Sequence, residues 1–279
     1  REIIGMTPEV TLDIHHIEQS YYSPPRKVRK DPWIGSSLCF DPLLLYNKGH
    51  WFEFMQASVE AGFFSPEYVI HRSGLFSNEA RLLFTELENQ RNLGSSIYIS
   101  SYLKIIEDGC NAVACLSGLP LTDRTLMKRF NEVAEAINRE DLAPILYGLI
   151  LGQNSPFPYY DYFFNSWKYY LEYFGNSDLA PLKMKADRIP YYTAPVSYYW
   201  NEHLASALWI MAKTWCSVAK AYQLDDNEYF GTFCNMLEIS PMFFANRKTQ
   251  LELFLDSIED AQKNWGDSQG LDANALENL

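Results

Sequence analysis

Apolar residues recur every three or four positions along most of this 279-residue chain, and this spacing constrains the fold more than any other feature. At that spacing the apolar side chains share one face of an α-helix. No segment alternates apolar and polar residues as a half-buried strand does, and no Asn-Gly or Asp-Gly pair joins two apolar runs. The sequence therefore predicts an all-α protein. The clearest stripes are Leu204, Leu208, Met211, Trp215, Val218 and Tyr222, and Leu251, Phe254, Leu255, Ile258, Ala261 and Trp265.

A capping side chain followed by proline marks several helix starts, because proline at the first helical position sacrifices no hydrogen bond. These pairs are Thr7-Pro8, Asp41-Pro42, Ser65-Pro66 and Ser240-Pro241, with Ser77, Thr122 and Ser177 as further caps and Gly62, Gly118 and Gly175 as stops. With boundaries good to a few residues, we expect helices at roughly 8–22, 42–61, 66–72, 78–92, 96–117, 123–138, 141–151, 158–174, 178–187, 196–222, 227–238 and 246–264.

Short connections between these helices favour antiparallel neighbours in a stacked-helix or bundle architecture of about ten to twelve helices. We expect residues 1–265 to form a single all-helical domain and residues 266–279 to be a flexible or weakly helical acidic tail. The loosest internal stretches are expected at Ser23–Ser37 and Lys183–Pro195.

Bulk properties exclude several classes of protein. The net charge of −12 argues against a nucleic-acid binder, which needs clustered Lys and Arg. Lys213 and Lys220 interrupt the longest apolar run, Leu204–Tyr222, so no membrane span is expected. No charged-then-apolar leader opens the chain. Five widely spread cysteines without a Cys-x-x-Cys pair indicate free thiols in a reducing compartment, and hence a cytoplasmic protein.

Acidic residues are concentrated in the last fifth of the chain, which carries eleven acids and three bases from Leu224 onward. Glu252, Asp256 and Asp260 are spaced four apart, so they share one helix face, with Glu259 beside them. Like charges at that spacing destabilise an isolated helix by roughly 0.2–0.5 kcal/mol per pair. Such a face is solvated, neutralised by the basic residues 26–30, or bound by a basic partner protein.

Sixteen aromatic side chains lie between Phe157 and Trp200. Most of those on the predicted helix at 158–174 fit a core stripe, but Tyr162, Tyr169 and Tyr173 fall on a different side. A helix buried on two sides would explain them. A protein interface or a sugar-stacking cleft would also explain them, because both use half-buried tyrosines.

The sequence contains no recognisable catalytic or metal-binding motif. Asp13 to Glu18 contains two histidines and two acids, but a metal site needs three or four converging ligands, so neither a metal nor another cofactor is expected. No nucleophile elbow, phosphate-binding glycine loop or His-Glu-x-x-His is present. Asp225, Asp226 and Glu228 fit the start of a helix, where acids complement the helix dipole.

Three segments resemble the all-helical immunity proteins that bacteria encode beside polymorphic or secreted antibacterial toxins. They are the run FNEVAEAI at Phe130–Ile137 with Asp141 and Leu146 after it, the Tyr-rich helix Tyr159–Phe174, and an acidic helix ending in Trp265. Together they span about half the chain. The resemblance implies a cytoplasmic, non-enzymatic protein that neutralises one cognate toxin, and such proteins often present acidic surfaces to basic toxin domains.

The leading hypothesis is therefore a protein that docks a basic toxin or effector domain. The binding residues would be the acids Asp225, Asp226, Glu228, Glu252, Asp256, Glu259 and Asp260, with Tyr162, Tyr169 and Tyr173 as aromatic anchors. The alternative is an α/α-barrel-type carbohydrate hydrolase whose general acid and base come from Asp161, Glu172, Asp187 and Glu202. A helical scaffold for larger assemblies is a third class.

Overall fold

The structure, a computed structural model, describes residues 1–7, 10–40, 42–89, 93–153 and 156–271. The fold is all-α, as the sequence predicts, and is organised around two long central helices, α5 (Ser95–Ser117) and α10 (Leu204–Tyr222). Both helices are buried on most of their circumference because other helices pack around them. This explains why their apolar residues extend well beyond a single stripe.

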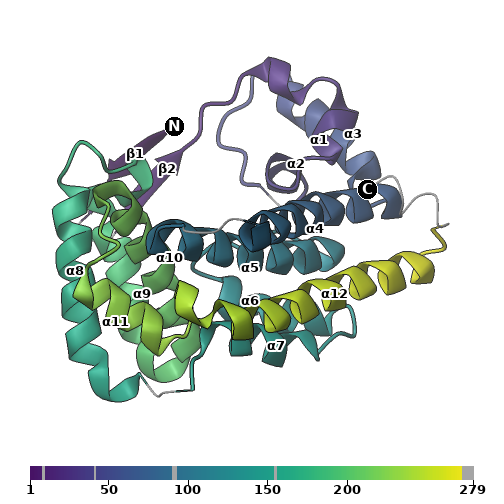
Figure 1. Cartoon of the computed structure of the whole chain (residues 1–279). Coiled ribbons are helices and arrows are strands. Elements are labelled where there is room, and N and C mark those ends of the chain that lie inside the picture. Colours follow the sequence, from purple (N-terminus) through teal and green to yellow (C-terminus); the bar gives the residue numbers. More distant parts are fainter. Residues whose placement is uncertain (8–9, 41, 90–92, 154–155, 272–279) are drawn as a thin grey trace.

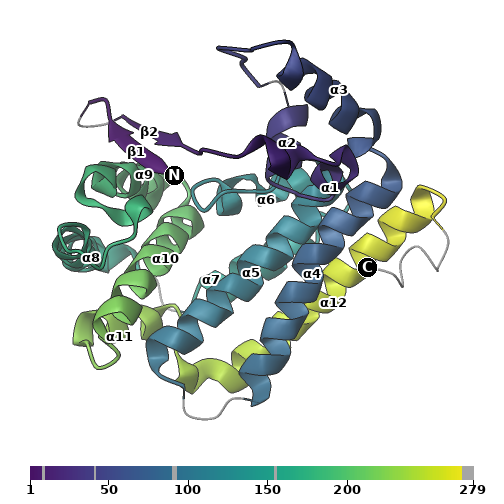
Figure 2. The same cartoon turned by 90° about the horizontal axis from the view of Figure 1, so that it is seen from above.

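One half of the molecule surrounds α5. The helix α4 (Pro66–Asn89) lies alongside α5 in both views (Figures 1 and 2), and α12 (Phe244–Ser268) packs against α4 and α5. α7 (Leu142–Ile150) lies against α12. The buried face of α12 contains the stripe predicted from the sequence, with Leu251, Phe254 and Ile258 fully buried.

The other half surrounds α10, which contacts α6 (Leu126–Glu135), α8 (Tyr160–Gly175) and α9 (Ile189–Glu202). A shorter helix, α11 (Glu228–Met236), packs against α8 and α10. Trp167 of α8 and Trp215 of α10 are fully buried here, and the indole N–H of Trp167 donates to the Thr214 hydroxyl at 2.9 Å. The predicted core stripe of the aromatic helix is thus confirmed.

The helix predicted at 8–22 is wrong, because the chain forms an antiparallel hairpin of β1 (Glu2–Gly5) and β2 (Thr11–Ile14), with Ile4 opposite Leu12. A 3₁₀ turn at Gln19–Tyr22 follows. The helical spacing of Val10, Ile14 and Ile17 was misleading, since Val10 and Ile17 are exposed and form no buried helix face. β-branched residues favour extended backbone instead. Of the predicted cap, Thr7 accepts a hydrogen bond from the Val10 N–H at 3.0 Å, whereas Pro8 and Glu9 lie outside the described residues.

The second predicted helix begins nine residues later than expected, at α3 (Trp51–Phe63). Asp41, its predicted cap, lies outside the described residues, and Pro42–Tyr46 are not helical. Conversely, the stretch expected to be loose contains two short helices, α1 (Pro25–Arg29) and α2 (Ile34–Cys39). These helices pack with α3 around a separate small core of Val28, Leu38, Val59 and Phe63. Bringing together residues thirty positions apart is a tertiary effect that local spacing does not predict.

Three further boundaries differ from the prediction. The helices expected at 66–72 and 78–92 are one helix, α4, because Ser77 is a buried residue rather than a cap and accepts a hydrogen bond from Gln262 of α12 at 2.9 Å. The segment predicted as helix 178–187 contains only 3₁₀ turns, Leu182–Met184 and Ala186–Arg188. The helix predicted at 196–222 is interrupted at His203, whose Nδ1 accepts from the Ser206 N–H and starts α10. Its first part, α9, begins at Ile189, so the second half of the stretch expected to be loose, Lys183–Pro195, is helical.

The described helices include none that combines the length and apolar character needed to cross a membrane. The five cysteines are all unpaired, and Cys110, Cys115, Cys216 and Cys234 are buried. Burial raises the pKa of the Cys39 thiol to about 11 and that of Cys115 to about 12.

Candidate functional site

The three tyrosines predicted as anchors lie on the outer side of α8 and are exposed, Tyr162 by 42%, Tyr169 by 63% and Tyr173 by 61%. α11 adds a fourth, Tyr229, whose ring centroid lies 5.4 Å from that of Tyr162. We call these four residues the tyrosine surface. The prediction that the first three leave the core face is confirmed, whereas Tyr229 was missed because its place beside α8 depends on tertiary packing.

A shallow hollow of about 470 Å³ lies within the tyrosine surface, and Tyr169, Glu172, Tyr173, Asn176, Ser177 and Tyr222 line it. The Tyr173 and Tyr222 rings pack at a centroid distance of 5.6 Å. Tyr170, behind Tyr169, accepts a hydrogen bond from the Asn227 side chain at 2.6 Å. The half-buried rings of Tyr170 and Tyr222 thus pack against the exposed rings of Tyr169 and Tyr173 and hold them in place, so the hollow is preformed.

The acids predicted at residues 225–228 separate into two roles. Asp225 is half-buried and its carboxylate accepts a hydrogen bond from the Ser96 N–H at 2.6 Å, so it caps the first turn of α5. Asp226 and Glu228 are exposed beside the tyrosine surface. Partial burial raises the pKa of Tyr162, and the charges of Glu228 and Tyr229 raise it further. Only the latter two acids are therefore free to contact a partner.

The four remaining predicted acids, Glu252, Asp256, Glu259 and Asp260, form an exposed row that we call the α12 acidic face. Arg81 of α4 pairs with two of them, with Nη2 2.7 Å from Asp256 and Nε 2.8 Å from Glu259. Neutralisation within the fold thus accounts for part of the row, but it comes from α4 and not from the basic residues 26–30. Arg29, for example, donates to the carbonyl oxygens of Ser58 and Val59.

The tyrosine surface and the α12 acidic face do not form one continuous site. In Figures 1 and 2, α8 and α11 lie at one side of the molecule and the C-terminal half of α12 extends along the other. A single partner domain docked on the tyrosines would therefore contact Asp226 and Glu228 but leave the α12 acidic face uncovered.

The acids expected for a carbohydrate hydrolase are all exposed. Asp161 and Glu172 are eleven residues apart on α8, and at 1.5 Å per residue their backbones are about 16 Å apart along the helix axis. Glycosidase carboxyl pairs are about 5–9.5 Å apart. Glu172 lines the hollow of the tyrosine surface, whereas Asp187 lines a different one beside Gly5 and Thr7. This arrangement offers no support for a glycosidase site.

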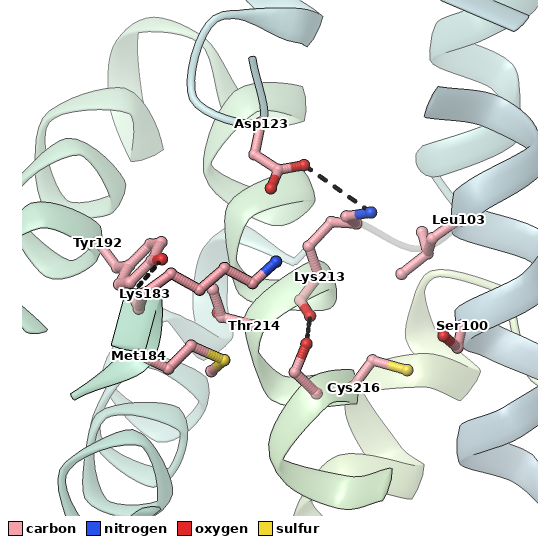
Figure 3. A pocket seen from close by; sticks show the side chains of 10 residues that line it. Ser100, Leu103, Asp123, Lys183, Met184, Tyr192, Lys213, Thr214 and Cys216 are labelled. Carbon is pink, nitrogen blue, oxygen red and sulfur yellow. Dashed lines mark hydrogen bonds and ion pairs between the residues drawn. The ribbon is translucent and has the colours of Figure 1, made fainter. Parts of the chain in front are cut away.

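A second feature, which the sequence reasoning missed, is a charged cavity of about 200 Å³ between α5, α10 and the segment before α9 (Figure 3). We call it the lysine cavity. Ser100, Leu103, Asp123, Lys183, Met184, Tyr192, Lys213, Thr214, Cys216 and Ser217 line it. From the sequence, Lys213 indicated only that the longest apolar run does not span a membrane. A lysine within an otherwise apolar helical run is also the signal of a buried charge that needs partners.

The ion pairs around Lys213 explain how a buried charge is tolerated. Its ammonium lies 2.8 Å from the Glu107 carboxylate and 3.8 Å from that of Asp123. Burial opposes protonation of Lys213, but the two carboxylates outweigh it and raise the pKa of the ammonium. Burial raises the pKa of Asp123, partly countered by Lys213. One Asp123 oxygen is buried without a hydrogen-bond partner.

Asp108, the residue after Glu107 on α5, is 1% exposed and accepts a hydrogen bond from Lys104 at 2.6 Å. Burial outweighs this contact and raises the pKa of Asp108 to about 6, and its second oxygen has no hydrogen-bond partner. Since the folded pKa exceeds the ordinary value, the native state holds this proton more tightly than the unfolded chain does. Stability from Asp108 is therefore present at low pH and is lost as pH rises through about 6.

We accordingly expect Asp108→Asn to raise the free energy of unfolding by about 1–3 kcal/mol at pH 8, because a neutral amide avoids the desolvation penalty. The gain should shrink between pH 6 and pH 4, where the native carboxyl is itself neutral. Urea unfolding at a series of pH values measures this. Asp141→Asn is the matched control of opposite sign, because Arg139 holds the pKa of Asp141 below its ordinary value. A gain for Asp108→Asn that does not change with pH would contradict the explanation.

No protein-family model, curated protein or solved structure matches the chain. Across the ranges that the structure describes, no three His, Cys, Asp or Glu side chains converge as a metal-binding group would require.

Proposed function

We propose that this chain is a non-enzymatic binding protein that docks a basic protein domain on the tyrosine surface of α8 and α11. The observation that carries the proposal is the row of four exposed tyrosine rings beside a preformed hollow. Tyrosines anchor protein interfaces because they contribute large contact areas with little loss of conformational entropy.

The charges around the tyrosine surface favour a cationic partner. Asp226, Glu228 and Asp161 are exposed nearby, whereas the one lysine on this side of α8, Lys168, lies 3.7 Å from Glu172. An Arg or Lys side chain of the partner would fit the hollow, where aromatic faces and the Glu172 carboxylate stabilise a cation. The resemblance to bacterial immunity proteins makes a toxin domain the proposed class of partner.

The binding test uses the product of the gene adjacent to this one, expressed as an inactive variant. We expect a complex whose dissociation constant rises with salt between 0.05 and 0.5 M, because exposed charges would steer it. The double variant Tyr169→Ser, Tyr173→Ser should raise the dissociation constant by about a hundredfold or more, since interface anchors are each worth roughly 1–3 kcal/mol. Isothermal titration calorimetry measures both effects.

The matched control is Tyr46→Ser, which removes an 81% exposed tyrosine outside the tyrosine surface. It should leave the dissociation constant within about twofold of that of the unaltered chain. The proposal fails if the adjacent gene product does not bind, or if the double variant binds as tightly as the control. Retained binding that is lost on charge reversal of Asp260 would instead locate the partner on the α12 acidic face.

A further inference from the structure

The lysine cavity contains more hydrogen-bond donors than the fold itself uses. In Figure 3 the ammonium groups of Lys183 and Lys213 and the carboxyl group of Asp123 face the same space, although they come from three separate segments. Within the described part of the chain, no carboxylate lies at ion-pair distance from the Lys183 ammonium. Lys213 has one close partner, Glu107, and its separation of 3.8 Å from Asp123 is too long for a direct hydrogen bond.

Three hydroxyl groups of the lining differ in whether they can still donate a hydrogen bond to a ligand. The Ser217 hydroxyl donates to the Lys213 carbonyl at 2.9 Å, and the Tyr192 hydroxyl donates to the Lys183 carbonyl at 2.7 Å. The Ser100 hydroxyl accepts from Lys220 at 3.3 Å, which leaves its own proton free to donate. The cavity thus presents two ammonium groups and a hydroxyl as donors, together with the partly exposed carboxylate of Asp123 as an acceptor.

Two further cationic side chains lie close to the cavity, whose own charges are those of Lys183 and Lys213 with Asp123 and the adjoining Glu107. Tyr191, next to the lining residue Tyr192, carries two guanidinium groups over its ring, those of Arg124 at 4.2 Å and Arg188 at 3.9 Å from the centroid. Their positive field adds to that of Lys183 and Lys213 and favours an anion. At about 30 Å³ per water-sized group, a volume of about 200 Å³ holds a molecule of roughly five to ten non-hydrogen atoms.

We propose that the lysine cavity binds a small oxyanion, a carboxylate or phosphate group, through Lys183, Lys213 and Ser100. A hydroxyl or amino group next to that oxyanion donates to the carboxylate of Asp123, which lines the cavity. The matching ligand class is a compact hydroxy acid, amino acid or phosphate. This site lies apart from the tyrosine surface and does not depend on the protein-binding proposal.

The experiment measures the thermal unfolding midpoint of the full chain in acetate, glycolate or inorganic phosphate from 0 to 50 mM, with sodium chloride keeping the ionic strength constant. Glycolate differs from acetate by the hydroxyl that Asp123 would accept, and phosphate distinguishes a phosphate site from a carboxylate site. We expect a saturable rise of the midpoint with glycolate or phosphate, and tighter binding of glycolate than of acetate.

Lys183→Gln is the test variant, because this ammonium makes no ion pair on which folding depends. It should raise the apparent dissociation constant by about tenfold. Asp123→Asn should abolish the preference for glycolate over acetate. Lys48→Gln removes one exposed charge away from the cavity and should change neither quantity.

Three results would overturn the proposal. The absence of saturable binding for every probe would mean that the cavity holds water only. An equal loss in Lys183→Gln and Lys48→Gln would mean that the probes respond to overall charge. Equal binding of acetate and glycolate by the unaltered chain would remove the role given to Asp123.

Discussion

Replacing Arg247 with methionine should lower the free energy of unfolding by about 3–5 kcal/mol, which is a large fraction of the stability of a domain. Arg247 is 3% exposed in the first turns of α12. Its guanidinium donates to the carbonyl oxygens of Leu237 at 2.8 Å, Glu238 at 3.0 Å and Gly148. One side chain thus joins α12 to the end of α7 and to the connection that follows α11.

The reason for the large effect is that methionine keeps most of the volume but leaves several buried carbonyl groups without donors, each costing about 1–3 kcal/mol. Arg247→Lys should recover only part of the loss, because the single ammonium group of lysine cannot donate to all the carbonyl oxygens that the planar guanidinium reaches. Urea unfolding followed by circular dichroism at pH 7 measures the change. Arg129→Met is the control, since Arg129 forms an exposed pair with Glu132 at 3.4 Å and should cost less than about 1 kcal/mol. A loss below 1 kcal/mol for Arg247→Met would show that water replaces the guanidinium.

The long helices were predictable because their stability depends on a continuous apolar face that the sequence itself displays. The stripe from Leu251 to Trp265 matches the buried side of α12, and the segment 96–117 matches α5 to within one residue at its start. The N-terminal quarter was not predictable in the same way. Its few apolar residues pack against partners far along the chain, as Phe63 does against Val28, and short segments of this kind follow tertiary context.

The candidate sites show the same difference between features set by local helix geometry and features set by tertiary packing. The outward side of α8 follows from helical geometry, so Tyr162, Tyr169 and Tyr173 could be named from spacing alone. The partial neutralisation of the α12 acidic face could not be predicted from spacing, because Arg81 lies 175 positions from Asp256. The lysine cavity joins Asp123 to Lys213 across ninety residues, and only the interrupted apolar run around Lys213 pointed to a buried charge. Long-range pairing of this kind is specified by the packed core and is not encoded in any local motif.

The crossing of α5 and α12 gives a second test with a large effect. Phe254 is fully buried, and its ring lies against Gly109, where a Cβ added to the glycine would be 2.8 Å from Phe254 Cε1 and 2.9 Å from Ile258 Cδ1. Phe254→Ala should therefore lower the free energy of unfolding by about 3–5 kcal/mol, through lost burial and the cavity that remains. Gly109→Ala should cost about 1–3 kcal/mol in the unaltered chain, because the crossing is already filled.

Combining the two substitutions distinguishes close packing from a general loss of helix stability. Once the Phe254 ring is absent, the methyl group at position 109 enters vacated space, and alanine is also a better helix former than glycine by about 1 kcal/mol. Gly109→Ala should thus be at least about 1 kcal/mol less harmful in the Phe254→Ala background than alone. Urea unfolding of the four proteins, the unaltered chain, the two single variants and the double variant, measures this interaction energy. If the two losses add to within about 0.5 kcal/mol, α5 and α12 are not in the tight contact on which the packing of this half of the molecule depends.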